Sequence, residues 1–403
     1  MKVCERFLKY VGIFSQSDEN SGTHPSTEGQ FDMADCLVNE LRELGIEIAR
    51  RDERCYVYAF VPASEGMEDR EKIGLIAHMD TAPAFCGEGV RPRLIENYDG
   101  EDIALDSDGN IVMETSVFPE LLNYKGQTLV VTDGTTLLGA DDKAGIAEIM
   151  TALERIIKDR LPHPAVCVAF TPDEEIGEGA DYFDVEGFGA DYAYTVDGGA
   201  LGELEYENFN AASARITVNG NCIHPGEGKN RMKNAVLTAM EFNSMLPPAE
   251  IPAHTEGYEG FYHITDIEGS EEKTVLRYII RDHDRESFED RKKAVRRIAD
   301  FLNEKYGAGT VELELKDSYY NMKEKIAPRM DIVERARKAF LDNGVEPRTL
   351  PIRGGTDGAR LSYMGLPCPN LSTGGHNFHG KFEYIPVESM EKMTDVLTAL
   401  ITG

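Results

Sequence analysis

Five short segments of the sequence carry histidine, aspartate or glutamate where a strand is expected to end or where glycines flank the side chain. In the first, an apolar run over residues 73–77 ends in His78, and Asp80 follows two residues later. Ligands bind at the carboxyl ends of strands in an α/β sheet. His78 can therefore offer its imidazole to a metal ion, and Asp80 can hold the other ring N–H. The alternative interpretation is an ordinary core histidine at the end of a strand.

The next two segments are acidic. Asp141 and Asp142 stand at the start of a predicted helix, where they can either cap the helix or place a carboxylate between two cations. Asp173, Glu174 and Glu175 follow a predicted buried strand. Within such a cluster, one carboxylate can bind a metal ion while its neighbour takes a proton from water. A solvated acidic loop is the alternative for this second cluster.

The last two segments combine ligand residues with glycine. Asp197 ends another apolar strand and precedes two glycines, and His376 and His379 lie in a glycine-flanked stretch near the C-terminus. An ordinary turn is the alternative for Asp197. Taken together, the donors are histidine, aspartate and glutamate, with no thiolate. That donor set suits zinc, cobalt or manganese in a hydrolytic centre with two metal ions.

The elements that must position these residues alternate between strands and helices. The expected helices cover residues 28–44, with a cap at Ser26 or Thr27, and residues 142–157. Apolar β-branched runs predict strands over residues 56–62, 73–77, 165–170 and 192–196. This alternation predicts an α/β fold, a three-layer sandwich around a largely parallel sheet.

The pattern changes near residue 207. Strands are expected over residues 215–219, 261–267, 274–280 and 310–315, and helices over residues 234–245 and 287–305. Their order, β-α-β-β-α-β, matches a ferredoxin-like unit. The α/β pattern then returns, with helices over residues 331–342 and 387–401 and strand-like runs over residues 348–352 and 370–372. We therefore expect a domain of residues 207–320 inserted into a catalytic domain formed by residues 1–206 and 321–403.

Composition narrows the functional class. The chain has 403 residues and a net charge of -30, which argues against nucleic acid or an anionic membrane as the main partner. No apolar run reaches the roughly 18 residues that a membrane helix needs. The 7 cysteines are scattered, an odd number without a CxxC pair, so reduced thiols and a cytoplasmic location are expected.

The order of these motifs resembles that of the co-catalytic zinc exopeptidases related to carboxypeptidase G and aminoacylase. Within that group the chain is most similar to the peptidase T family of tripeptide aminopeptidases, and the similarity covers nearly the whole sequence. The stretches that carry the closer resemblance are residues 171–175, 257–263, 280–282, 351–358 and 377–381.

The resemblance implies an enzyme that removes the N-terminal residue from short peptides, preferably tripeptides, with two zinc ions or with cobalt or manganese in their place. It implies that His78 and Asp197 bind one ion, Glu175 and His379 bind the other, and Asp141 bridges both. It also implies Glu174 as the general base, Asp80 as the support of His78, and a cis bond between Asp141 and Asp142.

In the smaller domain the resemblance implies three substrate-binding residues. His224 is expected to reach across a homodimer to the scissile carbonyl, and Arg281 and Arg353 to hold the substrate carboxylate. An edge strand such as residues 215–219 can pair with its mate across the two-fold axis.

The chain departs from the family pattern at residues 225–231 and at His283, both in the smaller domain. These departures bear on substrate length and side-chain preference. A dipeptidase or an N-acyl amino acid deacylase with the same metal chemistry is the alternative function.

Overall fold

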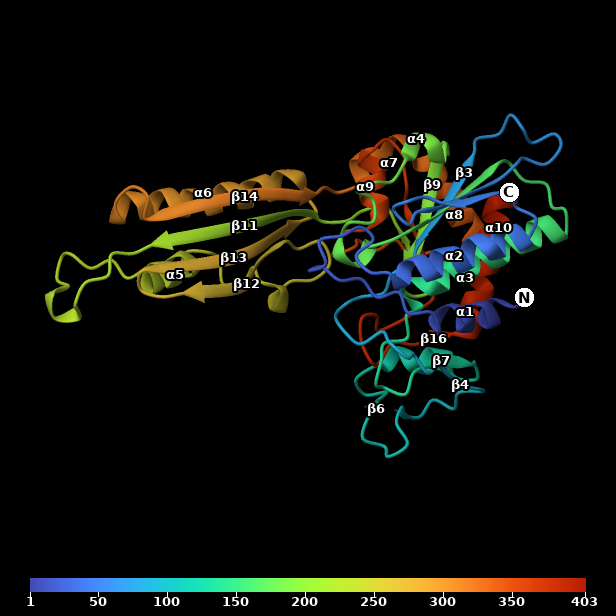
Figure 1. Cartoon of the computed structure of the whole chain (residues 1–403), viewed down its shortest axis with the longest axis horizontal. Helices are drawn as coiled ribbons and strands as arrows, with labels where there is room; N and C mark the ends of the chain where they lie inside the picture. The colour runs from blue at the N-terminus through green and yellow to red at the C-terminus, as the bar shows by residue number, and fades with distance from the viewer. The chain divides into compact units, whose positions relative to one another are not determined.

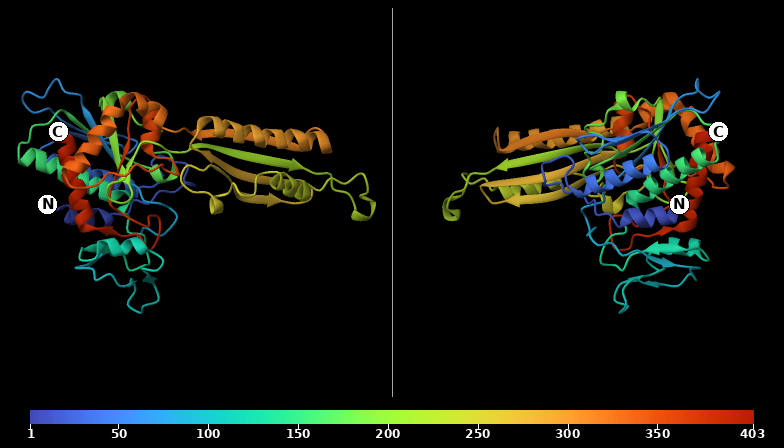
Figure 2. Two further views of the ribbon diagram at one scale, coloured as in Figure 1. Left: turned by 180° about the vertical axis from the view of Figure 1, so that it is seen from behind. Right: turned by 45° about the vertical axis from the view of Figure 1, so that its right-hand side comes forward.

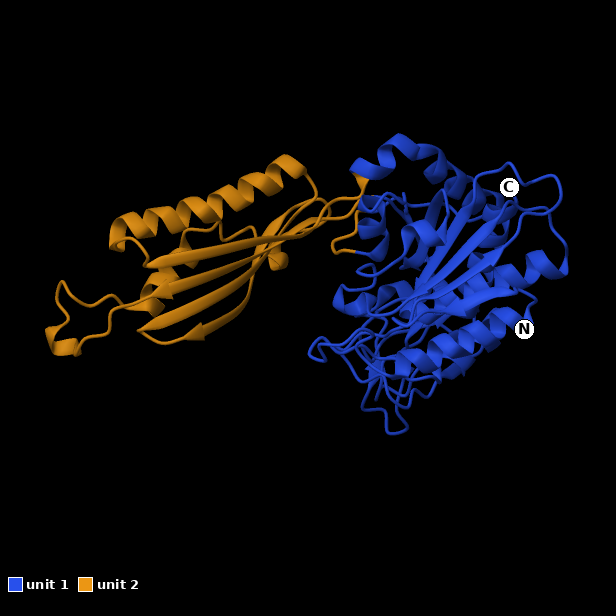
Figure 3. Ribbon diagram, turned by 45° about the horizontal axis from the view of Figure 1, so that its top comes forward, with its two compact units in different colours: residues 1–206, 324–350, 356–403 blue, residues 207–323, 351–355 orange.

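The computed structural model describes all 403 residues and divides the chain into two compact units. Unit 1 consists of Met1–Tyr206, Glu324–Leu350 and Thr356–Gly403, and unit 2 consists of Glu207–Lys323 and Pro351–Gly355 (Figure 3). The expected division assigned residues 351–355 to the larger domain. They fold with unit 2 because Ile352 forms a β-bridge with Asn208 and Arg353 donates to the backbone carbonyl of Gly257.

Unit 1 is built on a seven-stranded sheet with the order β1-β2-β8-β3-β9-β15-β10. Figure 1 labels β3 and β9 of this sheet. Its strands are β1 Ile48–Arg51, β2 Val57–Val61, β3 Ile73–His78, β8 Val166–Thr171, β9 Tyr192–Gly198, β10 Leu204–Glu205 and β15 Asn370–Ser372. The four strands β8, β3, β9 and β15 are parallel, whereas the outer pairs are antiparallel. The parallel part is therefore the centre of the sheet, where strands buried on both faces are expected.

Helices cover both faces of this sheet, which Figure 2 shows from behind and from a turned view. The helices of unit 1 are α1 Val3–Val11, α2 Gly29–Glu43, α3 Ala140–Lys158, α4 Val185–Phe188, α8 Met330–Asp342, α9 Asp357–Tyr363 and α10 Val387–Thr402, and α7 Lys323–Ile326 begins at the boundary. Ala193 of β9 packs in one core with Phe188 of α4 and Leu361 of α9. On the other face α3 lies so close to β9 that a Cβ at Gly145 would be 1.9 Å from the carbonyl oxygen of Val196. The predicted three-layer α/β sandwich is confirmed.

None of the helices combines the length and apolar character needed to cross a bilayer.

Two small sheets add a lobe to unit 1 that the sequence analysis did not predict. They consist of β4 Arg93–Ile95, β7 Leu129–Val131 and β16 Ile385–Pro386, and of β5 Ile103–Ala104 and β6 Val112–Met113, with the 3-10 helix η1 Pro119–Tyr124 beside them. Leu129, Val131 and Tyr384 belong to its separate core. Strands of two or three residues are too short to show a period in the sequence.

Unit 2 has a four-stranded antiparallel sheet with the order β12-β13-β11-β14. Its strands are β11 Asn210–Asn219, β12 Phe261–Gly269, β13 Lys273–Asp282 and β14 Val311–Tyr319, and its helices are α5 Ala235–Ser244 and α6 Arg285–Tyr306. Phe242 of α5 and Phe288 of α6 pack on the sheet in one core. The chain order confirms the predicted ferredoxin-like unit.

Three local expectations are wrong. Residues 215–219 do not form an edge strand, because β11 is bonded to β13 on one side and to β14 on the other. Neither Ser26 nor Thr27 caps α2, because the Ser26 hydroxyl donates to Asp173 instead. Residues 348–352 form only isolated bridges, since Pro347 and Pro351 supply no N–H to a ladder.

Candidate active site

The polar residues of the sequence motifs gather at the carboxyl ends of the three central parallel strands. His78 is the last residue of β3, Asp197 lies near the end of β9, and Glu174 and Glu175 form the 3-10 helix η2 Glu174–Ile176 just after β8. In the ladder, β3 lies between β8 and β9, and His78 is directly opposite Thr171 of β8. The three strand ends are therefore neighbours in space, which places the four side chains on one edge of the sheet.

A carboxylate lies between two imidazoles at this edge. Asp141 Oδ1 is 2.9 Å from His78 Nε2, and Asp141 Oδ2 is 3.0 Å from His379 Nε2. Each histidine also contacts a second carboxylate: His78 Nε2 is 3.3 Å from Asp197, and His379 Nε2 is 3.0 Å from Glu175. The structure thus brings together all five residues that the resemblance assigns to metal binding.

The two neighbouring aspartates at the start of α3 have different environments. The peptide bond between Asp141 and Asp142 is cis, as the resemblance implies. Asp142 points into the protein, where its carboxylate accepts the backbone N–H of His78 at 3.1 Å and that of Gly145 at 3.2 Å. Asp142 thus secures the helix start, while Asp141 faces the two histidines, where it could bind cations.

Asp80 connects His78 to the acidic segment that follows β8. Its two carboxylate oxygens accept the backbone N–H groups of Glu174 at 3.0 Å and of Glu175 at 3.1 Å. His78 Nδ1 lies 3.0 Å from the backbone carbonyl oxygen of Asp80 and 3.3 Å from its carboxylate. A single buried residue thus fixes the imidazole and the segment that carries the acidic side chains.

Burial and crowding shift the pKa values of this cluster strongly. Burial, with the nearby Asp141 carboxylate, raises the pKa of Glu175 to about 7, and burial raises the pKa of Asp197 to about 7. Burial also raises the pKa of Glu174 well above its usual range, with Asp197 as the next cause. Hydrogen bonds to Asp141 and Glu175 raise the pKa of His379 to about 11. Glu174, Glu175 and Asp197 are therefore poorly stabilised as anions by the protein alone, whereas hydrogen bonds from His379 and His78 lower the pKa of Asp141.

The donor set fits two divalent cations. Oxygen and nitrogen atoms of His78, Asp142 and Asp197, and those of His78, Asp141 and Glu175, all lie within 4.8 Å of one another in their group. No lysine or arginine forms an ion pair with these carboxylates. Glu175 Oε1 is buried without a hydrogen-bond partner. A buried carboxylate oxygen without a partner is costly, and a bound cation would remove that cost.

Glu383 is a residue of the site that sequence analysis missed. Its buried carboxylate accepts three backbone N–H groups, from Leu138 at 2.7 Å, Gly139 at 2.9 Å and Asp141 at 3.1 Å. These bonds fix the segment that presents Asp141. The available signal was a lone acidic residue beside the short apolar run that becomes β16, four residues after His379.

The other glycine-flanked histidine does not join the cluster. His376 is largely buried, its ring stacks on that of Tyr384 with centroids 4.8 Å apart, and its Nε2 lies 2.6 Å from the Tyr124 hydroxyl. Burial lowers the pKa of His376 to about 4. It is a neutral residue of the small-lobe core at neutral pH.

The three predicted substrate-binding residues all belong to unit 2. His224 is exposed in the loop after β11, where its Nδ1 accepts the backbone N–H of Gly226 at 3.2 Å. Arg281 Nη1 donates to the backbone carbonyls of Ala212 at 3.3 Å and Ile280 at 3.0 Å.

Arg353 is held in a similar way. Its guanidinium donates to the backbone carbonyls of Gly257 at 2.8 Å and Glu259 at 3.1 Å, and it stacks over the ring of Phe261 at 5.7 Å. Phe261 is also the residue opposite Arg281 in the ladder of β12 and β13. Neither arginine pairs with a carboxylate. Two half-buried cations without a counter-ion therefore lie at the same end of the unit 2 sheet.

Comparisons with known proteins show that the chain belongs to a peptidase family. Residues 126–403 match the model of peptidase family M20/M25/M40. The chain is 59% identical over 401 residues to Peptidase T of Halothermothrix orenii, an alignment that covers 99% of this chain and 98% of that protein. The fold matches that of aminopeptidase PepT from Bacillus cereus with a TM-score of 0.79 at 23% identity, over 100% of this chain and 97% of that one. It also matches a Bacillus subtilis protein that is a dinuclear metal binding peptidase from the M20 family. The TM-score is 0.65 at 15% identity, over 99% of this chain and 96% of that one.

We predict that Glu383→Ala weakens zinc binding by about 10–100-fold, the usual cost of losing a group that orients a metal ligand. The substitution leaves three buried N–H donors without an acceptor next to Asp141. Competition with a chromophoric chelator measures the affinity. Glu388→Ala is the matched control, because that carboxylate accepts the backbone N–H of Thr128 away from the histidines. Equal affinities of Glu383→Ala and wild type would contradict the role given to Glu383.

Proposed function

We propose, since the chain belongs to peptidase family M20/M25/M40 and closely resembles Peptidase T, that it is a metallo-aminopeptidase for short peptides, with tripeptides preferred. The observation that carries the proposal is the position of Asp141 between His78 and His379, with the free carboxylate of Glu174 on the adjacent segment. Together these residues could supply two cation sites and one base, a set that suits metal-assisted hydrolysis of a peptide bond.

In this proposal His78 and Asp197 hold one metal ion, Glu175 and His379 hold the other, and Asp141 binds both. Zinc is the proposed native ion, and the nitrogen and oxygen donors also suit cobalt or manganese. Divalent cations held by these residues would supply a lowered pKa for a nearby water molecule and polarisation of the scissile carbonyl. Asp80 positions the centre by holding His78 and the backbone of Glu174 and Glu175.

Glu174 is the proposed general base. Its backbone is fixed by Asp80, but its carboxylate makes no hydrogen bond and so remains free to exchange protons. The raised pKa of Glu174 favours uptake of a proton from the attacking water. The same proton then passes to the departing amine nitrogen as the peptide C–N bond breaks, which restores the carboxylate.

Arg281 and Arg353 are the proposed binding site for the substrate carboxylate. Both are half-buried and neither has a protein counter-ion, so an anion from outside the chain would neutralise their charge. Such a clamp limits the length of the peptide, because a longer substrate would place neutral backbone against two cations. The free α-amine of the substrate lies at the cleaved end, so N-acetylated peptides are not expected to be cleaved.

A homodimer formed through unit 2 is also part of the proposal, with His224 of one chain reaching the scissile carbonyl in the other. The edge that supports this is β12, which pairs only with β13. Exposed apolar side chains also lie on β12, namely Ile264 and Ile267, and on or just after helix α5, which packs on β11 and β13, namely Leu237, Met240 and Met245. A strand edge next to an apolar strip can meet its own copy across a two-fold axis.

The cytoplasm is the proposed location. The 7 free cysteines, of which three are buried, support it, because thiols stay reduced there.

Glu174→Ala is expected to lower kcat by about 10²–10⁴-fold, the usual contribution of a general base, while both metal ions stay bound. Tripeptide hydrolysis and metal analysis on the same sample measure the two effects. Glu186→Ala, an exposed acidic residue on α4, serves as the control. Activity of the Glu174 variant within about tenfold of wild type would exclude it as the base.

Arg281→Met or Arg353→Met should remove most of the preference for a free tripeptide over its C-terminal amide. Wild type is expected to prefer the free acid by about 10²-fold in kcat/KM, the scale of leaving a buried charge unpaired. Arg285→Met is the matched control, because that arginine of unit 2 stacks on Tyr320 and pairs with Glu289. If both variants keep the wild-type ratio, the two arginines are structural and the length limit has another origin.

Replacing Leu237 and Met240 with glutamate should convert the dimer to monomers in light scattering, because like charges then meet across the two-fold axis. Phe301→Glu is the control, since this exposed residue lies on α6, the other helix of unit 2.

Mixed dimers test whether His224 acts in the site of the other chain. A dimer of one Glu174→Ala chain and one His224→Ala chain has one intact site if His224 acts across the interface, and no intact site if it acts within its own chain. Activity of about half the wild-type value is expected, and a fully active monomer would refute the dimer proposal.

A further inference from the structure

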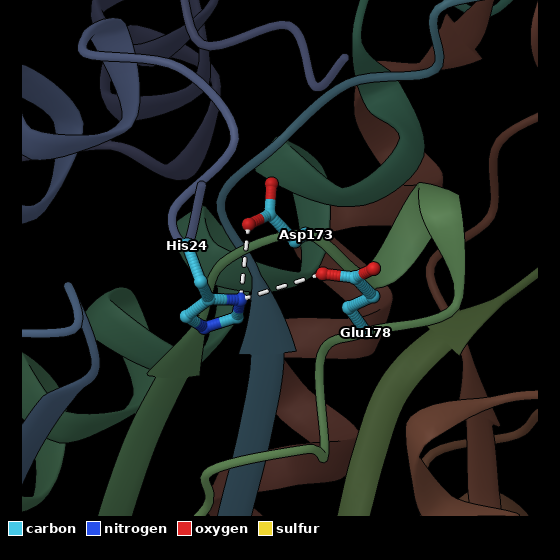
Figure 4. Close-up of side chains that lie close together, drawn as sticks. All are labelled: His24, Asp173 and Glu178. Carbon is cyan, nitrogen blue, oxygen red and sulfur yellow. Dashed lines mark ion pairs between the residues drawn. The ribbon is translucent and has the colours of Figure 1, made fainter. Parts of the chain in front are cut away.

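A second cluster of ligand residues includes Asp173, the residue before the proposed base, and has no part in the function proposed above. It consists of His24 in the loop between α1 and α2, Asp173 between β8 and η2, and Glu178 just after η2 (Figure 4). His24 Nδ1 is 3.3 Å from a carboxylate oxygen of Asp173 and 3.8 Å from one of Glu178. The three donor atoms all lie within 4.8 Å of one another.

The His24 imidazole is buried without hydrogen bonds. Its side chain is only 9% exposed, and neither ring nitrogen has a hydrogen-bond partner. The ring lies near two tyrosines, with centroids 5.7 Å from Tyr56 in a stacked arrangement and 4.8 Å from Tyr182 in an edge arrangement. These contacts fix the ring so that Nδ1 points toward the two carboxylates (Figure 4). A buried nitrogen without a partner is costly, and a bound ligand at Nδ1 would remove that cost.

Asp173 is prepared in the same way. Its side chain is fully buried, and it accepts the backbone N–H of Ser26 at 2.7 Å, the Ser26 hydroxyl and the side-chain amide of Gln30 at 2.6 Å. These donors hold the carboxylate in place but carry no full charge. No lysine or arginine forms an ion pair with Asp173 or Glu178. The Glu178 side chain is 47% exposed, which leaves this side of the cluster open to solvent.

We propose that His24, Asp173 and Glu178 bind a divalent transition-metal ion, additional to the ions of the proposed catalytic centre. An ion held about 2.1 Å from each donor in tetrahedral geometry places its donors about 3.4 Å apart. The 3.3 Å between His24 and Asp173 matches this spacing, and the 3.8 Å to Glu178 requires only a small movement of a half-exposed side chain. Imidazole with two carboxylates suits zinc, manganese or cobalt, whereas calcium and magnesium prefer oxygen donors alone.

Such an ion would join two segments that are far apart in the sequence. His24 belongs to the loop that also carries Ser26, whereas Asp173 directly precedes the proposed base Glu174. The ion would add a bond between this loop and the segment that carries the base, in addition to the hydrogen bonds that Asp80 accepts from that segment. Its role is therefore to position the segment, with no contact to the reacting atoms.

The test counts bound ions. Wild-type protein and its variants are stripped with a chelator, equilibrated with buffered Zn²⁺ alone and analysed by mass spectrometry of the metal. His24→Phe keeps an aromatic ring beside the two tyrosines but removes the nitrogen donor, and Glu178→Gln removes a charge at a half-exposed position. Glu186→Gln is the control, because this exposed carboxylate lies in the same unit.

Wild type and the control are expected to bind one ion per chain more than His24→Phe and Glu178→Gln. Equal counts in wild type and either of these two variants would overturn the proposal, and would mean that His24 is only a buried neighbour of the carboxylates. If His24→Phe does not fold, Glu178→Gln decides. The result does not depend on the proposed function, because a wrong assignment of the catalytic centre would change the wild-type total but not this difference of one ion.

Anomalous diffraction from wild-type crystals grown with Zn²⁺ gives a second measurement. The absence of a peak between the three side chains would also overturn the proposed site.

Discussion

Mutual repulsion among carboxylates at the ends of β3, β8 and β9 is the constraint on which the arrangement of unit 1 depends. Asp141, at the start of α3, approaches both histidines, whereas Asp197 approaches His78 and Glu175 approaches His379. Two like charges about 4 Å apart repel by roughly 4 kcal/mol at an effective dielectric constant of about 20. Folding must therefore hold these groups together against their own charge. The imidazoles lie between the carboxylates and separate them, and cations would remove the remaining repulsion.

The fold meets this constraint with a second set of buried carboxylates that bind backbone instead of ligands. Asp80 holds the N–H groups of Glu174 and Glu175, Asp142 holds those of His78 and Gly145, and Glu383 holds three around Asp141. Charge-assisted bonds of this kind are stronger than neutral ones. Each presenting segment is thus fixed by an acidic residue of its own, so the facing side chains need no direct support. A strongly acidic composition serves the interior as well as the surface.

The longer helices and strands, which show a clear hydrophobic period, and the ligand residues next to them could be predicted from the sequence. The central strands and α3 lie within a few residues of their expected positions, and the five proposed ligands gather as the motif order implied. The lobe around β7 escaped prediction because its strands are too short to show a pattern. Glu383 escaped because its partners are backbone groups, which no pattern of side chains can reveal. The edge position of residues 215–219 failed for a different reason: strand order depends on pairing, and the hydrophobic period does not report it.

The membership of residues 351–355 in unit 2 limits how segments of this protein can be exchanged by gene recombination. The chain passes from one unit to the other four times, at residues 206–207, 323–324, 350–351 and 355–356. Ile352 bridges to Asn208, and Arg353 binds the carbonyls of residues 257 and 259, so this short return completes unit 2 although it is distant in sequence. A gene rearrangement that exchanged only the long insert would separate the insert from the segment that completes it. Recombination between relatives is therefore expected to preserve function only when both pieces come from the same parent, which makes the two segments a single unit of inheritance.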